Sequence, residues 1–399
     1  MLKNNYTKPN KMVYSCFRFM SWILNKFKFG TKYETNEIKN KKGPFVVLAN
    51  HEMALDIFTL INSTKRNMTI VMSKSFQETL PFNKSVKKMG MISKQQFMTT
   101  PVDIIKMISV IKNGGVLLLF PSGIMTEDGL PTPTPESTYR FLKKLGSDIY
   151  VAKLSNTYFL NPKWSKGIKK GKCFVNIKKV LSKEELKSFE NDKIKQIISN
   201  ELDFDVYKEQ EKRMIKYKGI DNLAGLENVL YQCPHCFKEY SISTSKNLIY
   251  CDECGFEHYC DKFGFLHQKD QSKKEFRYIY QWNKFILDEI KKNYPYDEEM
   301  KMEEETDIYL VNHKNHKYEK FGEGKVSFYF SHIHLEGMIN GESISYDMPL
   351  KNVPILPFSP GKHLEIQTED FSYRLVFKDK RKVMKMINLI KYGYEIDNN

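Results

Sequence analysis

The chain has 399 residues, 41% of them hydrophobic, so it is long enough for more than one domain with a core of its own. Lysine and arginine number 63 against 48 acidic residues, and the resulting net charge of +15 favours an anionic partner: a phospholipid surface, a nucleic acid or an acidic carrier protein. The sequence has no run of about 18 apolar residues, so no transmembrane helix is predicted. It also has no secretory signal pattern, so export is not predicted. A compositional bias of the genome would give the same charge.

Residues 11–28 are predicted to form an amphipathic helix. Apolar side chains recur there at intervals of four and three residues, at Val13, Phe17, Met20, Leu24 and Phe27. Trp22 and Ile23 widen this face, and basic residues flank it. Such a stripe is typical of a helix that lies in a membrane interface, so residues 1–30 are assigned that role. The alternative is a helix that packs its apolar face on the domain behind it.

Residues 31–205 alternate between apolar runs and helical periods, which predicts an α/β domain with a helix-covered sheet. Strands are expected at 45–49, 68–72, 116–120, 149–154 and 174–180. Helices are expected at 102–112 and 183–202, where the period is 3.6 residues.

The rest of the chain is predicted to form smaller parts. Residues 206–230 are polar and are assigned to a linker, residues 231–267 hold a small cysteine module, and residues 268–305 hold a helix and an acidic linker. Residues 306–399 alternate in short apolar runs and end in a helix. This pattern resembles a mostly-β domain of the pleckstrin-homology (PH) or GRAM type.

A histidine and an aspartate follow the first predicted strand, in the segment NHEMALD that begins at Asn50. His51 and Asp56 meet if the histidine lies in the turn and the aspartate lies on the first turn of a helix. The carboxylate then accepts a hydrogen bond from one imidazole nitrogen, and the other nitrogen can take a proton from a hydroxyl. Asn50 is expected to cap the helix. A lone His-x4-Asp spacing also arises by chance, so the pattern gains weight only from the segments that follow.

Three further segments come in order: Gly90-Met91-Ile92-Ser93-Lys94, Phe120-Pro121-Ser122-Gly123 and Val151-Ala152-Lys153. Together with NHEMALD they resemble the four sequence blocks of the lysophospholipid acyltransferase family (PlsC-like, 1-acylglycerol-3-phosphate O-acyltransferases), over about residues 15–205. The resemblance implies acyl transfer from acyl-CoA or acyl-carrier protein to a lysophospholipid or glycerolipid hydroxyl, with no covalent acyl-enzyme. It also implies that His51 is the general base and that Asp56 orients it.

The same resemblance assigns substrate binding to Asn50, Gly90, Lys94, Pro121, Ser122 and Gly123. The block at Gly90 matches the one that helps hold the acceptor's phosphate, and Lys94 stands where the family commonly has an arginine. A lysine there acts as a point charge without bidentate geometry. The third block departs more, because Ser122 and Met125 replace the family's glutamate and arginine. This puts lysophosphatidic acid in doubt as the acceptor.

Four of the seven cysteines form two C-x2-C pairs, Cys233/Cys236 and Cys251/Cys254, separated by 14 residues. The odd count and the spacing argue against a disulfide framework and for a reducing compartment. Four thiolates so spaced predict a zinc ribbon, in which zinc has a structural role because so small a module lacks an apolar core. A redox pair or a ribbon without metal is the alternative. Nucleic acid is a disfavoured partner, because the module from Cys233 to Cys254 offers two lysines against three acidic residues.

The sequence therefore predicts a membrane-associated acyltransferase, cytoplasmic and peripheral on the inner face of the cell membrane. Its expected partners are the phospholipid surface, a lysophospholipid acceptor and acyl-CoA or acyl-carrier protein as donor. The alternative is a catalytically inactive adaptor that binds lipid or protein through the same modules. His51 and Asp56 distinguish the two, because a binding module needs no base.

Overall fold

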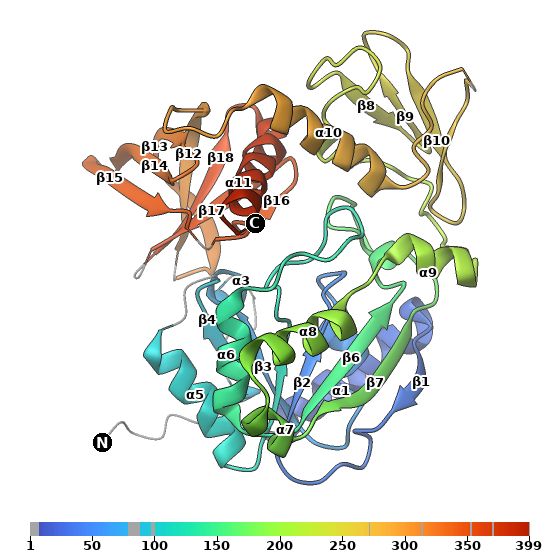
Figure 1. The fold of residues 1–399 in the computed structure, drawn as a ribbon, viewed down its shortest axis with the longest axis vertical. Helices are drawn as coiled ribbons and strands as arrows, with labels where there is room; N and C mark the ends of the chain where they lie inside the picture. Colours follow the sequence, from blue (N-terminus) through green and yellow to red (C-terminus); the bar gives the residue numbers. More distant parts are fainter. Residues whose placement is uncertain are drawn as a thin grey trace. The chain divides into compact units, whose positions relative to one another are not determined.

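The structure is a computed structural model that describes residues 8–78, 88–96, 100–270, 272–312, 314–351, 353–368 and 371–398 (Figure 1). The chain divides into two compact units. The first comprises the described residues up to 162 together with 168–218, and the second comprises 163–167 together with the described residues from 219 onward.

A mixed sheet forms the centre of the first unit. Within the described residues it has seven strands in the order β1-β7-β6-β2-β5-β3-β4, and the strands run parallel to their neighbours except for the antiparallel pair β6 and β7. The strands are β1 (Lys32–Asn36), β2 (Phe45–Ala49), β3 (Met68–Ser73), β4 (Ile92–Lys94), β5 (Val116–Leu119), β6 (Ile149–Ser155) and β7 (Phe174–Leu181). β2 lies between β5 and β6, and all of its residues are buried. Buried parallel strands read as continuous apolar runs, which explains why the sequence predicts them well.

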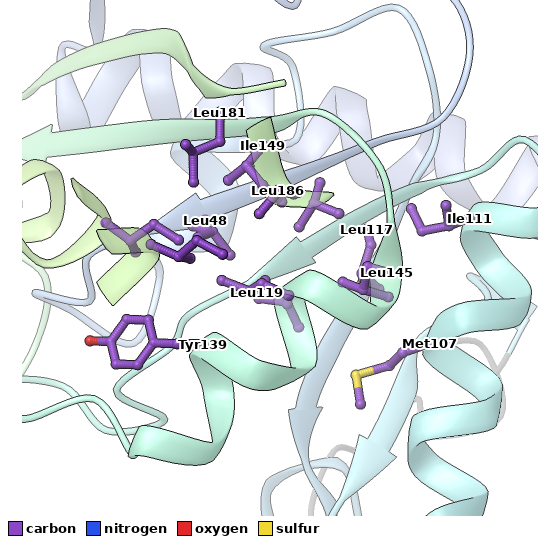
Figure 2. Packing of buried hydrophobic residues seen from close by; sticks show 14 of the residues in the cluster. Leu48, Met107, Ile111, Leu117, Leu119, Tyr139, Leu145, Ile149, Leu181 and Leu186 are labelled. Atoms are coloured by element: carbon purple, nitrogen blue, oxygen red, sulfur yellow. The ribbon is translucent and has the colours of Figure 1, made fainter. Parts of the chain in front are cut away.

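Helices cover both faces of this sheet. They are α1 (Lys11–Leu24), α2 (Asp56–Leu60), α3 (Lys74–Glu78), α5 (Pro101–Lys112), α6 (Glu136–Leu145), α7 (Lys183–Ser188), α8 (Asn191–Leu202) and α9 (Val206–Arg213). On one face, Leu48 and Leu119 pack with side chains of α5 to α8, among them Met107, Tyr139 and Leu186 (Figure 2). On the other face, Val47 and its neighbours pack with Leu60 of α2. Alternate residues of each strand thus feed two separate cores.

Most predicted elements of this unit are present with nearly the predicted ends, but two differ. The expected helix at 183–202 is two helices, α7 and α8, because Phe189 has an extended backbone that ends α7. The expected linker at 206–230 begins with α9 in this unit, where Tyr207 is buried, and its part from residue 219 onward belongs to the second unit, where Leu226 and Leu230 are buried. The burial of these positions could not be predicted, because the segment is polar overall and its apolar residues do not follow one helical period.

The N-terminal helix α1 continues into a π-helical turn, Asn25–Phe29. The predicted apolar stripe is split: Phe17 is half-buried, and its ring stacks on Phe58 of α2 at 6.0 Å, whereas Met20 and Phe27 are exposed. The fully buried positions of α1 are instead Tyr14 and Ser21. The helix is therefore amphipathic in a different register from the predicted one.

The second unit begins with a small antiparallel sheet of order β11-β10-β9-β8. Its strands are β8 (Ile242–Ser245), β9 (Leu248–Cys251), β10 (Glu257–Cys260) and β11 (Leu266–Gln268). The helix predicted within 268–305 is α10 (Ile279–Asn293), and part of the expected acidic linker is already strand, because β12 begins at Met302. The segment 163–167 belongs to this unit. Trp164 is buried there, with its carbonyl oxygen so close to Gly225 that a Cβ on this glycine would lie 2.1 Å away.

The C-terminal region is mostly β structure, as predicted. An antiparallel sheet, seven-stranded within the described residues, has the order β15-β14-β13-β12-β18-β17-β16. Its strands are β12 (Met302–Asn312), β13 (Lys317–Phe328), β14 (His332–Ile339), β15 (Glu342–Pro349), β16 (Phe358–Ser359), β17 (His363–Gln367) and β18 (Ser372–Phe377). Helix α11 (Val383–Asn398) follows, as predicted, and buries Val383, Met386, Ile387 and Ile390. The more specific PH- or GRAM-like assignment stays a prediction.

Candidate functional site

The turn between β2 and α2 carries the histidine and the aspartate. His51 follows the end of β2, and Asp56 is the first residue of α2, as the spacing predicts. The Nδ1 atom of His51 lies 2.9 Å from Oδ2 of Asp56. The same oxygen accepts the backbone N–H groups of Glu52 over 2.7 Å and of Met53 over 3.0 Å. Three donors thus hold a fully buried carboxylate in one orientation against the imidazole.

The imidazole of His51 also has a second support. Its ring stacks on Phe120, with centroids 4.4 Å apart and planes inclined by 28°. The His51 carbonyl accepts the backbone N–H of Thr126 over 3.2 Å, which joins the turn to the loop after β5. Because Asp56 engages Nδ1, the nitrogen that remains for proton transfer is Nε2.

A cavity of about 230 Å³ opens beside this histidine. Asn50, His51, Pro121 and Ser122 form part of its wall, together with the loop Pro131–Thr134 and residues Leu202 to Phe204 after α8. Its wall is mostly apolar side chains and hydroxyl groups, and no lysine or arginine is among the described residues that line it. A cavity of this kind suits an apolar chain better than a phosphate.

The comparison with protein families agrees with this geometry. Residues 30–164 match the family model described as Acyltransferase. This stretch is a domain of the acyltransferase family. It contains the His51–Asp56 pair and Pro121 and Ser122 of the cavity wall.

Comparisons with curated proteins and solved structures gave the following results. No curated protein matches the sequence. The 1-acyl-sn-glycerophosphate acyltransferase PlsC of Thermotoga maritima is 19% identical, with 51% of this chain and 79% of that chain covered and a TM-score of 0.41. The Ran-binding domain of Nup2 from Ashbya gossypii is 12% identical, covers 24% of this chain and 97% of its own, and has a TM-score of 0.20. The EVH1 domain of Dm DCP1, solved with an XRN1 peptide, is 20% identical, with coverages of 32% and 97% and a TM-score of 0.20.

Within the acyltransferase domain, Asn50 has a different role from the predicted one. The expected cap of α2 is wrong, because the residue before this helix is Leu55, which makes no side-chain cap. Asn50 instead spans to β6: its Oδ1 accepts the Leu154 N–H over 2.7 Å, and its Nδ2 donates to the Leu154 carbonyl over 2.9 Å. The amide thereby fixes the end of β2 to the end of β6, next to the cavity.

The block after β5 lies partly in the cavity wall. Pro121 and Ser122 line it, and the Ser122 hydroxyl donates to the Ile124 carbonyl over 3.0 Å. Gly123 is not among the lining residues; its φ of +68° is a conformation that suits glycine. The side chain of Gln96 donates to the Gly123 carbonyl over 2.6 Å, which ties this loop to the segment after β4.

The block around β4 is separate from the cavity. Gly90, with a φ of +72°, precedes β4, and Lys94 ends it; neither is among the described residues that line the cavity. Burial lowers the pKa of Lys94 by desolvating its ammonium group, while the charge of Asp103 opposes this. The structure therefore does not bring this predicted phosphate-binding block together with the cavity wall.

Glu52 was missed as a functional residue by the sequence reasoning. Only 1% of its surface is exposed, and burial, followed by the charge of Asp56, raises the pKa of its carboxyl group to about 8. Three donors meet this carboxyl group: the nearby Asn50 amide, the Thr157 hydroxyl and the Tyr158 N–H. The sequence around Glu52 carries no pattern that predicts its burial, because two of its three partners are more than 100 residues away.

The four paired cysteines come together in the second unit. Their sulfur atoms all lie within 4.8 Å of one another, with 3.6 Å between Cys233 and Cys254 and 3.7 Å between Cys236 and Cys251. Four thiolates bound to one zinc ion lie about 3.8 Å apart, given Zn–S bonds of about 2.3 Å in a tetrahedron. The Ser241 hydroxyl lies 3.2 Å from the Cys251 sulfur, and the His235 N–H donates to the Cys233 sulfur over 3.4 Å. The cluster could hold a metal ion, and its donor set fits zinc.

None of the helices in the described part of the chain is both long and apolar enough to span a bilayer.

Proposed function

We propose that this protein is a membrane-associated O-acyltransferase. It moves a fatty acyl group from acyl-CoA or acyl-carrier protein to the hydroxyl of a lysophospholipid or related glycerolipid. The observation that carries the proposal is the His51–Asp56 pair, with Nδ1 and Oδ2 2.9 Å apart, in the wall of a cavity in an acyltransferase-family domain.

In the proposed reaction, Nε2 of His51 takes the proton of the acceptor hydroxyl as its oxygen attacks the thioester carbonyl. The tetrahedral intermediate collapses to an ester and expels the carrier's thiolate, which receives the proton from the imidazolium. Asp56 stabilises the imidazolium, because its carboxylate faces Nδ1. No covalent acyl-enzyme is needed.

The cavity beside His51 is the proposed site of the acyl chain. Apolar side chains such as Pro121, Leu202 and Phe204 favour a hydrocarbon chain, and the charged group among its described lining, Asp203, disfavours a phosphate. The acceptor's headgroup is proposed to bind through Gly90 and Lys94, outside the cavity. Because Ser122 and Met125 replace an acidic and a basic residue of the family pattern, a lysophospholipid other than lysophosphatidic acid is the favoured acceptor.

Membrane association is proposed to run through α1, whose two faces differ. The inner face packs Tyr14 and Phe17 in an apolar cluster and is also tied by hydrogen bonds, from Ser21 to the Phe58 carbonyl over 2.6 Å and from Arg18 to the Thr64 carbonyl over 2.8 Å. The outer face of α1 and of the π-helical turn after it exposes the large apolar side chains Met12, Phe19, Trp22, Ile23 and Phe27. Lys26 sits over the Trp22 ring at 4.8 Å, so a cation accompanies this apolar surface. Such a face suits an anionic lipid interface, and it belongs to a helix that packs on α2, the helix of Asp56.

A structural zinc ion is proposed at Cys233, Cys236, Cys251 and Cys254. Zinc would cross-link the two turns that carry the cysteines and supply folding energy to a module with a small core. The PH- or GRAM-like character of residues 306–399 belongs to the proposal as well, as a further surface for lipid or protein.

The test is an assay of the purified chain with labelled acyl-CoA and acyl-carrier protein and a panel of lysophospholipids. His51→Ala is the test variant, and His332→Ala, in the second unit, is the control. We expect transfer by the wild type and the control, and none by His51→Ala. Equal transfer by His51→Ala would remove the mechanism, and failure of the wild type with every acceptor would favour the inactive adaptor.

A further inference from the structure

Glu52 connects the turn of the proposed base to a distant part of the acyltransferase domain. The Asn50 side-chain amide donates to its Oε1 over 3.0 Å. On its Oε2, the Thr157 hydroxyl donates over 3.0 Å and the Tyr158 backbone N–H over 2.9 Å. Tyr158 begins the short 3₁₀ helix Tyr158–Leu160, just after β6. The carboxylate therefore ties the turn after β2 to the segment after β6.

In all three contacts an oxygen of Glu52 is the acceptor. A backbone N–H such as that of Tyr158 can only donate. The orientation of the Asn50 amide is set by Leu154, because its Oδ1 accepts the Leu154 N–H and its Nδ2 donates to the Leu154 carbonyl. A glutamine at position 52 would turn its own NH₂ group toward one of these donors. A carboxyl group thus fits this position better than an amide, because both of its oxygens can accept hydrogen bonds, also in the protonated form that burial favours by raising the pKa of Glu52 to about 8.

The backbone of Glu52 then transmits this anchoring to the histidine. Its N–H donates over 2.7 Å to Oδ2 of Asp56, the atom that His51 Nδ1 contacts over 2.9 Å. Glu52 is thus held at two points. Its side chain is bonded to Thr157 and Tyr158, and its backbone N–H is bonded to the carboxylate of Asp56, which orients the imidazole. If the side-chain anchor is lost, the N–H of Glu52 is free to move, and Asp56 loses one of three donors.

We propose that Glu52 is a positioning residue for acyl transfer, which clamps the His51 turn to Thr157 and Tyr158 and so fixes the imidazole in its productive orientation. This inference rests on the proposed function, in which His51 is the base. It predicts a loss in the chemical step with little change in substrate binding, because Glu52 is buried and is not among the described residues that line the cavity.

The experiment compares Glu52→Gln, Thr157→Val and Thr157→Ser with the wild type. Thr157 is fully buried, and valine keeps its shape but removes the hydroxyl, whereas serine keeps the hydroxyl. We expect Glu52→Gln and Thr157→Val to lower kcat about 10- to 100-fold, with KM within about twofold, as for groups that orient a functional side chain through hydrogen bonds. Thr157→Ser should keep kcat within about threefold. Leu186→Ala, in the core of the same structural unit, is the control for general destabilisation.

A second readout is the Nδ1 proton of His51 in nuclear magnetic resonance spectra of histidine-labelled protein, assigned by its absence in His51→Ala. A hydrogen bond to Asp56 shifts this proton downfield, and we expect the shift to be lost in Glu52→Gln and Thr157→Val but kept in Thr157→Ser and Leu186→Ala. An unchanged signal in Glu52→Gln, or an equal fall in kcat for Leu186→Ala, would overturn the inference. If the wild type transfers no acyl group, the proposed function fails, while the resonance still decides whether Glu52 positions the imidazole.

Discussion

The His51 turn and the cysteine cluster both hold a few polar side chains in a fixed geometry, but they do so by different means. The cluster is local in sequence: its four ligands come from two C-x2-C pairs, and their sulfur atoms lie within 4.8 Å of one another. The His51 turn depends on partners far along the chain, with Asn50 bonded to Leu154 and Glu52 to Thr157. The cysteine cluster is therefore expected to need an ion for its stability, whereas the His51 turn is stabilised by the chain alone.

Removal of the metal should have the largest effect and should be confined to the second unit. A structural zinc site contributes on the order of 10 kcal/mol to folding, so chelation or Cys251→Ser should unfold the module that contains β8 to β11. Hydrogen exchange of these strands, read by mass spectrometry, measures the effect. Cys260→Ser is the control, because Cys260 is buried in the same module but lies outside the cluster. Unchanged protection after complete metal removal would contradict a structural role.

Asp56→Asn should give the next largest effect, in the first unit. An amide at this position has the same shape, and its oxygen can still accept from His51, Glu52 and Met53, but it lacks the negative charge that stabilises the imidazolium formed in the reaction. We expect kcat to fall about 10²- to 10⁴-fold, the range that general base catalysis supplies. Circular dichroism should show the secondary structure retained. A kcat close to that of the wild type would mean that His51 needs no orienting carboxylate.

The buried carboxyl group of Glu52 should make stability depend on pH. Its folded-state pKa of about 8 lies above that of an unfolded glutamate, about 4.3. The folded state therefore binds this proton more tightly, and the stabilisation is fully present below about pH 4 and is lost as pH rises through about 8. Urea unfolding at several pH values should show this decline for the wild type. Between pH 5 and 9, the free energy of unfolding should fall less in Glu52→Gln than in the wild type, by on the order of a few kcal/mol. Parallel pH profiles for the two proteins would show that Glu52 does not titrate in this range.

The outer face of α1 should give the smallest effect, on membrane binding. Trp22 and Phe27 are 48% and 55% exposed, and each aromatic ring that enters a lipid interface contributes about 1 to 2 kcal/mol. Trp22→Ala with Phe27→Ala should therefore reduce sedimentation with anionic vesicles at least about tenfold. Phe76→Ala is the matched control, because Phe76 is 49% exposed but lies on α3 and outside the regions proposed to contact lipid. Equal binding by the double variant and the control would exclude α1 as the membrane contact.

The contrast between the two sites also explains what the sequence could predict. β2 and β5 are unbroken apolar runs, and Cys233 to Cys254 has a spacing that a metal imposes, so each could be found from neighbouring residues alone. Strand β1 escaped prediction, because its residues Lys32–Asn36 are polar and mostly exposed. It pairs with β7, which lies some 140 residues later.

The same reasoning applies to the candidate site. The contact between His51 and Asp56 follows from five residues of chain and was predicted. The roles of Asn50 and Glu52 were not, because their partners Leu154 and Thr157 are more than 100 residues away. Spacing therefore predicts which groups can meet across one turn, whereas the contacts that hold the turn in place depend on the fold of the whole sheet.

The segment 163–167 has a consequence for any attempt to divide the protein. It belongs to the second unit, although the residues on either side of it, up to 162 and from 168 to 218, belong to the first. A single cut near residue 218 would thus leave the buried Trp164 without Gly225, its neighbour in the second unit. The first unit, expressed alone, would carry the segment 163–167 without the second-unit residues that it belongs with. Neither unit is one continuous stretch of chain, so a single cut cannot separate them.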